Sequence, residues 1–243
     1  MTNSAAAGSV LPERVLVVAA HPDDVDFGSA GTIATWTDRG VTVSYCVITD
    51  GAAGSSDPEV DLATLALRRE DEQRKAAAEV GVSEVVFLGY PDGRLSVSMD
   101  LRRDVSRVIR AVRPDCVICQ SPDRNWDRIR ASHPDHLAAG EATLQAVYPD
   151  ARNPYAHPEL LSEGLEPHAV GEGWLMASPR ADRYVDITEA IDRKIAALKS
   201  HESQIGDPEQ LEEMIRAWAG ATAQRGGLEP GRLAEVFQVV DTH

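Results

Sequence analysis

The stretch VLVVAAHPDDVDFGSAG, residues 15–31, joins a strongly apolar run to a cluster of ionisable side chains. Residues 15–20 are apolar throughout, as expected of a strand buried on both faces. Four ionisable residues follow at once: His21, Asp23, Asp24 and Asp26. The loop after a parallel strand lies at the carboxyl edge of the sheet, where open α/β folds place their sites. The stretch therefore predicts a buried strand that presents chemically active side chains at the sheet edge.

Short apolar runs alternate with helical patterns along the chain, which is typical of βαβ units around a parallel sheet. We expect strands at residues 15–20, 41–49, 84–88 and 115–120, and shorter ones at 172–177, 183–187 and 234–240. We expect helices at residues 31–39, 62–80, 100–112 and 135–147, one ending near residue 201, and one beginning at 207–208. The predicted class is α/β: a single domain with a Rossmann-like, mostly parallel sheet flanked by helices.

Composition narrows the function classes. The 243 residues include 39 acidic and 24 basic ones, a formal net charge of -15 that disfavours binding to nucleic acid or to an anionic membrane surface. Residues 1–12 are expected to form a flexible N-terminal tail before a domain at 13–243, with no membrane-spanning segment. Cys116 and Cys119 fall three apart on an expected strand, point to opposite faces, and fit a reducing cytoplasm better than a disulfide or metal site.

A second motif, SHPDH at residues 132–136, opens the helix that follows the fourth expected strand. That helix start faces the same sheet edge as the first motif, so the two should converge. Catalytic zinc sites commonly use two imidazoles, one carboxylate and an open water position. His21, Asp24 and His136 supply that set, which predicts one Zn²⁺ per chain, although another divalent cation such as Fe²⁺ suits the same ligands.

The residues left unligated suit amide hydrolysis. Asp23 is a free carboxylate that could take a proton from the nucleophilic water. His133 is expected to be protonated, held so by Asp135 or nearby negative charge, and to stabilise the oxyanion. Asp135 could also fix the tautomer of one imidazole. Asp26 is the remaining candidate for a carboxylate that supports the metal ligands without binding the metal itself. The G-x-G-x-x-G fingerprint of a dinucleotide site is not met after the first strand.

These motifs resemble the LmbE-like, or PIG-L, family of metal-dependent N-deacetylases, whose relatives include mycothiol-pathway deacetylases and amidases. The resemblance also rests on four further segments: TDG at 49–51, REDEQRKAAAEVGV at 69–82, FLGYPDG at 87–93 and KSHESQ at 199–204. It implies the same ligands and the same general base, with Arg69 as a substrate contact and a pocket role for His201. One departure is Val25, where the family often has Glu.

Three further residues are candidates for the substrate pocket. Asp50 ends the second strand and is expected to line the pocket floor. Asp92, in YPDGR, fits a tight turn best and a pocket contact second. Arg124 lies before the second motif and is expected at the mouth.

The predicted function is removal of an acyl group, such as acetyl, from an N-acylated amino sugar or related small amide. Three alternatives stay open. An amidase of a larger thiol conjugate would share the site, and a two-metal phosphoesterase would use Asp23, Asp24, Asp26 and Asp50 for a second cation. A non-catalytic sugar- or metal-binding module is disfavoured by Asp23, which metal binding does not require. A homo-oligomer is compatible with the sequence.

Overall fold

The structure, a computed structural model, describes residues 11–243. Its strands form one sheet in the order β3-β2-β1-β4-β5-β7-β6. Strands β1 to β5 run parallel, whereas β7 is antiparallel to both β5 and β6. The bounds are β1 (Arg14–Ala19), β2 (Thr42–Thr49), β3 (Glu84–Tyr90), β4 (Cys116–Gln120), β5 (Glu172–Met176), β6 (Arg183–Asp186) and β7 (Ala234–Asp241). All seven predicted strands are present, and the predicted single-domain α/β class is confirmed.

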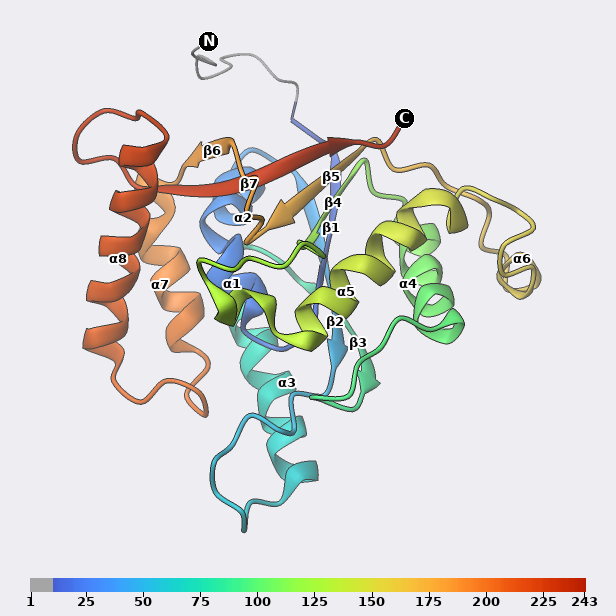
Figure 1. The fold of residues 1–243 in the computed structure, drawn as a ribbon, viewed down its shortest axis with the longest axis horizontal. Helices are drawn as coiled ribbons and strands as arrows, with labels where there is room; N and C mark the ends of the chain where they lie inside the picture. The colour runs from blue at the N-terminus through green and yellow to red at the C-terminus, as the bar shows by residue number, and fades with distance from the viewer. Residues whose placement is uncertain (1–10) are drawn as a thin grey trace.

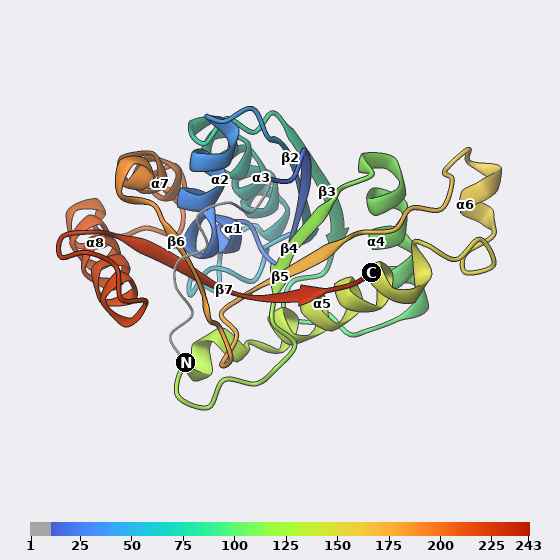
Figure 2. The same cartoon turned by 90° about the horizontal axis from the view of Figure 1, so that it is seen from above.

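Helices cover both faces of this sheet (Figures 1 and 2). Helices α2, α3 and α7 lie on one face with α8 outside them, and α4 and α5 lie on the other (Figure 2). The bounds are α1 (Asp24–Gly28), α2 (Ala30–Thr37), α3 (Leu62–Glu79), α4 (Met99–Val112), α5 (Pro134–Gln145), α6 (Glu159–Ser162), α7 (Ile191–Lys199) and α8 (Pro208–Arg225). No helix within residues 11–243 is long and apolar enough to cross a membrane.

The continuous apolar run of β1 follows from this layering. Val15 and Val17 pack into the core under α2 and α3, while Leu16 and Val18 pack into the core under α4 and α5. Successive side chains of a strand point to opposite faces, so a strand covered on both sides needs apolar residues at every position. Such a strand is held rigidly, which fixes the position of the loop that follows it.

Cys116 and Cys119 fall in the two opposite cores, as predicted, and both are unpaired and buried.

Two connections differ from the expectation. The helix expected at 31–39 is preceded by the short α1, which begins at Asp24 directly after the first motif. The loop expected at 149–170 contains α6, and the fully buried guanidinium of Arg110 on α4 donates to several of its backbone carbonyl oxygens. A long connection with a buried backbone needs such donors. Of the predicted flexible tail, residues 1–12, the first ten lie outside the described residues.

Candidate active site

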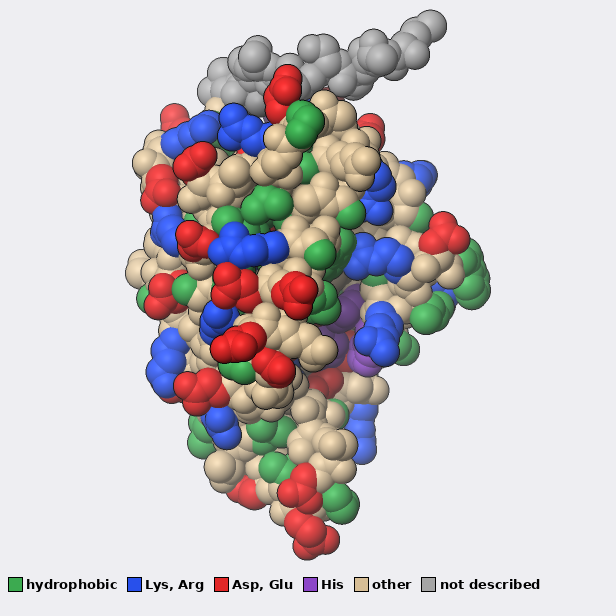
Figure 3. Space-filling view, turned by 90° about the vertical axis from the view of Figure 1, so that its left-hand side faces the viewer, with side chains coloured by type: hydrophobic (Ala, Val, Ile, Leu, Met, Phe, Trp, Pro, Cys, Tyr) green, Lys and Arg blue, Asp and Glu red, His purple; other side chains and the backbone are tan. Residues whose placement is uncertain are grey.

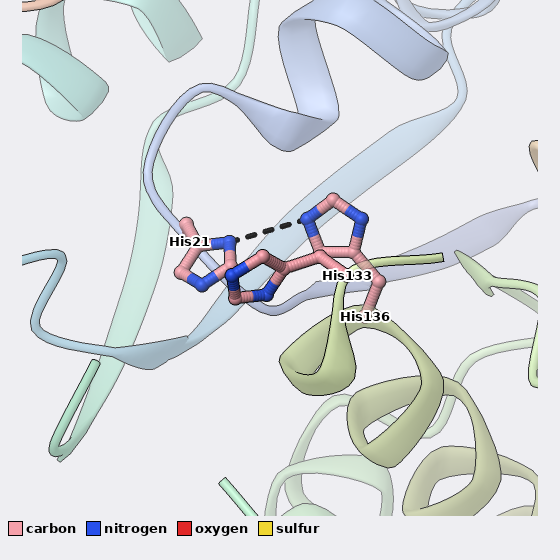
Figure 4. Close-up of side chains that lie close together, drawn as sticks. All are labelled: His21, His133 and His136. Carbon is pink, nitrogen blue, oxygen red and sulfur yellow. Dashed lines mark hydrogen bonds between the residues drawn. The ribbon is translucent and has the colours of Figure 1, made fainter. Parts of the chain in front are cut away.

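Two loops at the carboxyl edge of the sheet bring three histidines together (Figure 4). His21 follows β1, whereas His133 and His136 stand at the first turn of α5. The centroids of the three imidazole rings lie 5.1 to 5.3 Å apart. On the face shown in Figure 3, histidine side chains are visible in a hollow beside acidic side chains. The structure thus brings the two His-Pro-Asp motifs together, as the sequence predicted.

The donor atoms of His21, Asp24 and His136 form a small triangle. Nδ1 of His21 lies 3.1 Å from one carboxylate oxygen of Asp24, and Nε2 of His136 lies 3.1 Å from the other. The two nitrogens are 3.3 Å apart. With metal–ligand bonds of about 2.0 Å, the ligand atoms of a tetrahedral zinc lie about 3.3 Å apart. The residues present therefore fit one divalent metal ion.

Both imidazoles of the triangle are oriented by acceptors on their outer nitrogens. Nε2 of His21 lies 3.1 Å from Oδ1 of Asp92 and 3.3 Å from Oδ2 of Asp135. Nδ1 of His136 lies 3.4 Å from the carbonyl oxygen of Ala131. Because these partners accept hydrogen bonds, the neutral form of each imidazole carries its proton on the outer nitrogen, and its inner nitrogen can bind a metal in place of a second proton. Asp135 therefore lies where the sequence placed it, beside an imidazole whose tautomer it can fix.

The carboxylates around His21 favour positive charge at this position. Burial by itself lowers the pKa of an imidazole, yet hydrogen bonds to Asp24 and Asp92 raise the pKa of His21 to about 11. The side chain is 11% exposed, so solvent does little to screen these charges. A divalent cation satisfies the same surplus of negative charge, which supports the fit of the donor set to a metal.

Gln120, the last residue of β4, is part of the site and was missed in the sequence. Its Nε2 donates to Oδ2 of Asp24 at 2.8 Å, and its Oε1 accepts the N–H of Ala20 at 3.1 Å. The side chain therefore fixes the carboxylate of Asp24 relative to the end of β1. A polar residue closing the buried run DCVICQ is the signal that could have revealed it.

Asp23 lies beside the triangle but outside it. Its carboxylate is 18% exposed and accepts a hydrogen bond from Arg69 at 3.1 Å. Burial, together with the neighbouring charge of Asp24, raises the pKa of Asp23 to about 7. Its backbone has φ 95°, a conformation that costs a residue other than glycine about 1–3 kcal/mol. Because of this conformation, the consecutive side chains of Asp23 and Asp24 contact different partners: Asp23 contacts Arg69, and Asp24 contacts the two imidazoles of the triangle.

The prediction that Asp135 holds His133 protonated is wrong. Nδ1 of His133 accepts the backbone N–H of Asp135 at 3.2 Å, so this nitrogen carries no proton. The carboxylate of Asp135 is used elsewhere, by the backbone N–H of Gly93 and Leu95 as well as by His21. Burial and the nearby rings of His21 and His136 lower the pKa of His133. His133 is therefore a neutral imidazole whose remaining N–H, at Nε2, can donate.

Three residues predicted for the substrate pocket or a turn form hydrogen bonds to other parts of the protein. They are Arg69, Asp50 and Asp92. Arg69 is 3% exposed, and its guanidinium donates to two backbone carbonyl oxygens in addition to Asp23. Asp50 accepts the backbone N–H of Asp92 at 3.1 Å, which holds that loop in place. Asp92 is more than a turn residue, because its carboxylate reaches His21. These side chains position the cluster and leave little free surface for a substrate.

Asp26 and His201 lie behind the site. Both side chains are fully buried, and Nε2 of His201 lies 2.8 Å from Oδ2 of Asp26. The predicted pocket role of His201 is therefore wrong, because no part of the side chain is accessible. Asp26 makes no hydrogen bond to His21, Asp24 or His136, so the expectation that it supports the ligands directly is also wrong. Oδ2 of Asp26 is engaged by Gln73 and His201, and Oδ1 of Asp50 by backbone N–H groups, so these carboxylates already have partners that a second cation would have to share.

Arg124 lies in the loop between β4 and α5. It is exposed, and its guanidinium carbon lies 5.4 Å from the centroid of the exposed Trp126 ring. Arg124 lies on the loop that leads into the second motif, and its role at the mouth of the substrate pocket stays a prediction.

The sequence profile of the PIG-L family, described as GlcNAc-PI de-N-acetylase, matches residues 16–147, a range that holds both motifs. Diacetylchitobiose deacetylase of Thermococcus kodakarensis is 33% identical over 229 residues, covering 94% of this chain and 83% of that protein. Probable N-acetyl-alpha-D-glucosaminyl L-malate deacetylase 2 of Bacillus subtilis is 31% identical, covering 85% of this chain and 90% of that protein. The chain belongs to the PIG-L family, as the resemblance predicted.

A solved structure supports the same conclusion. N,N'-diacetylchitobiose deacetylase from Pyrococcus horikoshii, complexed with an inhibitor, superposes with a TM-score of 0.86 at 30% identity. The superposition covers 95% of this chain and 85% of that one. The fold and the family therefore agree over nearly the whole chain.

Proposed function

We propose that the chain is a zinc-dependent N-deacetylase that removes the acetyl group from a small N-acetylated amino sugar. The observation that carries the proposal is the triangle of donor atoms from His21, Asp24 and His136, with the Asp23 carboxylate beside it and outside it. The deacetylases named among its relatives support the substrate class. The three buried, unpaired cysteines support a reducing compartment such as the cytoplasm.

His21, Asp24 and His136 would hold the metal. His133 also has a nitrogen within 4.8 Å of nitrogens of the other two histidines. We assign the third ligand to Asp24 because its two contacts are shorter and because Nδ1 of His133 already accepts a backbone N–H. A bound Zn²⁺ supplies a Lewis acid that polarises the amide carbonyl and makes water acidic enough to be deprotonated near neutral pH.

The chain's own residues then move the protons. The Asp23 carboxylate takes a proton from the attacking water and returns it to the amide nitrogen as the carbon–nitrogen bond breaks, which gives a free amine and acetic acid, and the acid releases its proton to solvent as acetate. Arg69 fixes one oxygen of that carboxylate. The neutral His133 donates its Nε2 hydrogen to the oxygen that becomes negative, a contribution strongest in the transition state.

The test is acetate release from N-acetylated sugars, beginning with N,N'-diacetylchitobiose, by zinc-loaded protein and by Asp23→Asn. We expect the wild-type protein to release acetate. We expect Asp23→Asn to lose about 100-fold or more in kcat while its metal content stays unchanged. Wild-type turnover by Asp23→Asn, or no acetate from any N-acetylated sugar, contradicts the proposal.

The two-metal phosphoesterase alternative predicts two ions per chain. Metal analysis of the same samples distinguishes it, since we expect one.

A further inference from the structure

The backbone of Asp23 needs support from outside its own loop. Its φ of 95° lies in the left-handed region, where L side chains are rarely found. Such conformations persist only where surrounding contacts determine them, and they gather at functional sites. Arg69 holds the carboxylate end of the residue, so the remaining question is what holds its backbone.

Gln73 on α3 makes that contact. Its side chain is fully buried, and its Oε1 accepts the N–H of Asp23 at 2.8 Å. The N–H of a residue at a strained turn has few acceptors within reach, and a buried N–H without a partner is costly. Gln73 therefore stabilises the conformation of Asp23 that directs its carboxylate toward Arg69.

The orientation of the Gln73 amide is itself fixed from the other side. Its Nε2 donates to Oδ2 of Asp26 at 2.9 Å, and the same oxygen accepts Nε2 of His201 at 2.8 Å. All three side chains are fully buried. A flipped amide would set its oxygen against the carboxylate of Asp26 and its NH₂ against the N–H of Asp23, so this network permits one orientation only.

We propose that Gln73 is a positioning residue for Asp23, locked in its working orientation by Asp26 and His201. The inference rests on the proposed role of Asp23 as general base, and it gives the buried Asp26–His201 pair a function in the reaction. These residues touch neither substrate nor metal. They act through the backbone of Asp23, so they should govern the efficiency of proton transfer and leave metal binding and substrate binding intact.

The first experiment replaces the amide by an apolar side chain of similar length. Gln73→Met removes both hydrogen bonds of the side chain. We expect kcat on an N-acetylated sugar to fall about 10- to 100-fold, because a misplaced base loses most of its contribution. The expected KM is within about twofold of wild type, and zinc content stays at one per chain, because His21, Asp24 and His136 keep their contacts.

A rescue separates positioning from general stability. Gln73→Glu keeps an acceptor for the Asp23 N–H but sets a carboxylate against Asp26. Combining it with Asp26→Asn exchanges the amide and the carboxylate, so both hydrogen bonds of residue 73 can form again, while His201 carries its proton on Nδ1 and accepts the second amide hydrogen at Nε2. We expect the double variant to recover at least a third of the wild-type kcat, whereas Gln73→Glu alone stays low. The stability control is Thr32→Val. It removes a buried hydrogen bond from the Thr32 hydroxyl to Glu235, which does not involve Asp23, and should keep the wild-type kcat.

The outcomes are distinguishable. If Gln73→Met turns over like wild type while Asp23→Asn is inactive, the positioning role is refuted and the proposed function stands. If Asp23→Asn is fully active, the proposed function fails first. If Gln73→Met does not fold, the double variant decides: a kcat as low as that of Gln73→Glu alone overturns the proposal, and recovery supports it. A rise in KM or a loss of zinc in Gln73→Met would also contradict it.

Discussion

The two carboxylates behind His21 give a quantitative test of the metal centre. Asp92 and Asp135 both approach Nε2 of His21, at 3.1 and 3.3 Å. Acceptors in this position orient a metal-binding imidazole and make it more basic, and losing one typically weakens metal affinity 10- to 100-fold. Asp92→Asn keeps the shape of the side chain and removes its charge, so it isolates this effect.

The structure indicates where in that range each variant falls. In Asp92→Asn the carboxylate of Asp135 still accepts the His21 proton, and only one backbone N–H, that of Ala53, loses a charged acceptor, so we expect the low end, about a 10-fold loss or about 1.4 kcal/mol. In Asp135→Asn two backbone N–H groups also lose a charged acceptor, so the loss should approach 100-fold. The double variant should lose more than the product of the two, because no carboxylate is left to orient the ring.

Competition with a chromogenic zinc chelator at fixed pH measures these affinities. Asp38→Asn removes the same charge from a side chain that is 64% exposed and away from the cluster, so it controls for net charge and should match wild type. Affinity within twofold of wild type in Asp92→Asn, together with a normal double variant, would refute the idea that these carboxylates orient a metal ligand.

Three further predictions concern other parts of the chain. His136→Ala should lose zinc, whereas His133→Ala should keep it and lose about 10- to 100-fold in kcat; metal analysis showing the reverse pattern would exchange the two imidazoles. The pKa of His201 is raised because its hydrogen bond to Asp26 outweighs burial, so its proton stabilises the fold fully below pH 6.5 and less as pH rises through the raised pKa. The difference in unfolding free energy between wild type and His201→Leu should therefore shrink above pH 6.5, and a difference that grows with pH would contradict this. Arg110→Leu should lower the unfolding free energy by about 3 kcal/mol in urea, because several buried carbonyl oxygens lose their donor; a loss under 1 kcal/mol would show that they find other partners.

The sequence predicted the strands and the donor set for a simple physical reason. A parallel strand covered on both faces must be apolar throughout, so polar residues that follow it at once mark the sheet edge. His21 and Asp24 carry that signal in one motif, and His136 carries it in the other. The antiparallel insertion of β7 between β5 and β6 could not be predicted, since strand order depends on contacts between distant segments.

The roles of the surrounding side chains were harder to predict because they depend on partners far along the chain. His201 lies in a segment that resembles the family, yet its partner Asp26 is 175 residues away and both are buried. His133 was expected to be held protonated by Asp135, two residues away, or by other negative charge nearby. The contact there comes from the backbone N–H of Asp135, and the sequence gives no means of distinguishing it from the carboxylate.

Two glutamines that the sequence did not single out support the first motif in the same way. Each accepts one backbone N–H of the motif and donates to a carboxylate a few residues later. Gln120 joins the N–H of Ala20 to Asp24, and Gln73 joins the N–H of Asp23 to Asp26. An amide suits this task because it has both an acceptor and a donor, whereas a carboxylate or an ammonium group has only one of them.

The shared hydrogen-bond pattern of Gln120 and Gln73 leads to a final prediction. Gln120 holds a proposed metal ligand and Gln73 holds the proposed base, so the same truncation should change different quantities. Gln120→Met should weaken zinc affinity about 10-fold and leave the kcat of zinc-saturated protein within about threefold of wild type. Chelator competition and kinetics at saturating zinc measure the two quantities separately. If Gln120→Met binds zinc normally but loses kcat as Gln73→Met is expected to, Asp24 does not depend on Gln120 for its orientation, and the division of labour between the two aspartates is wrong.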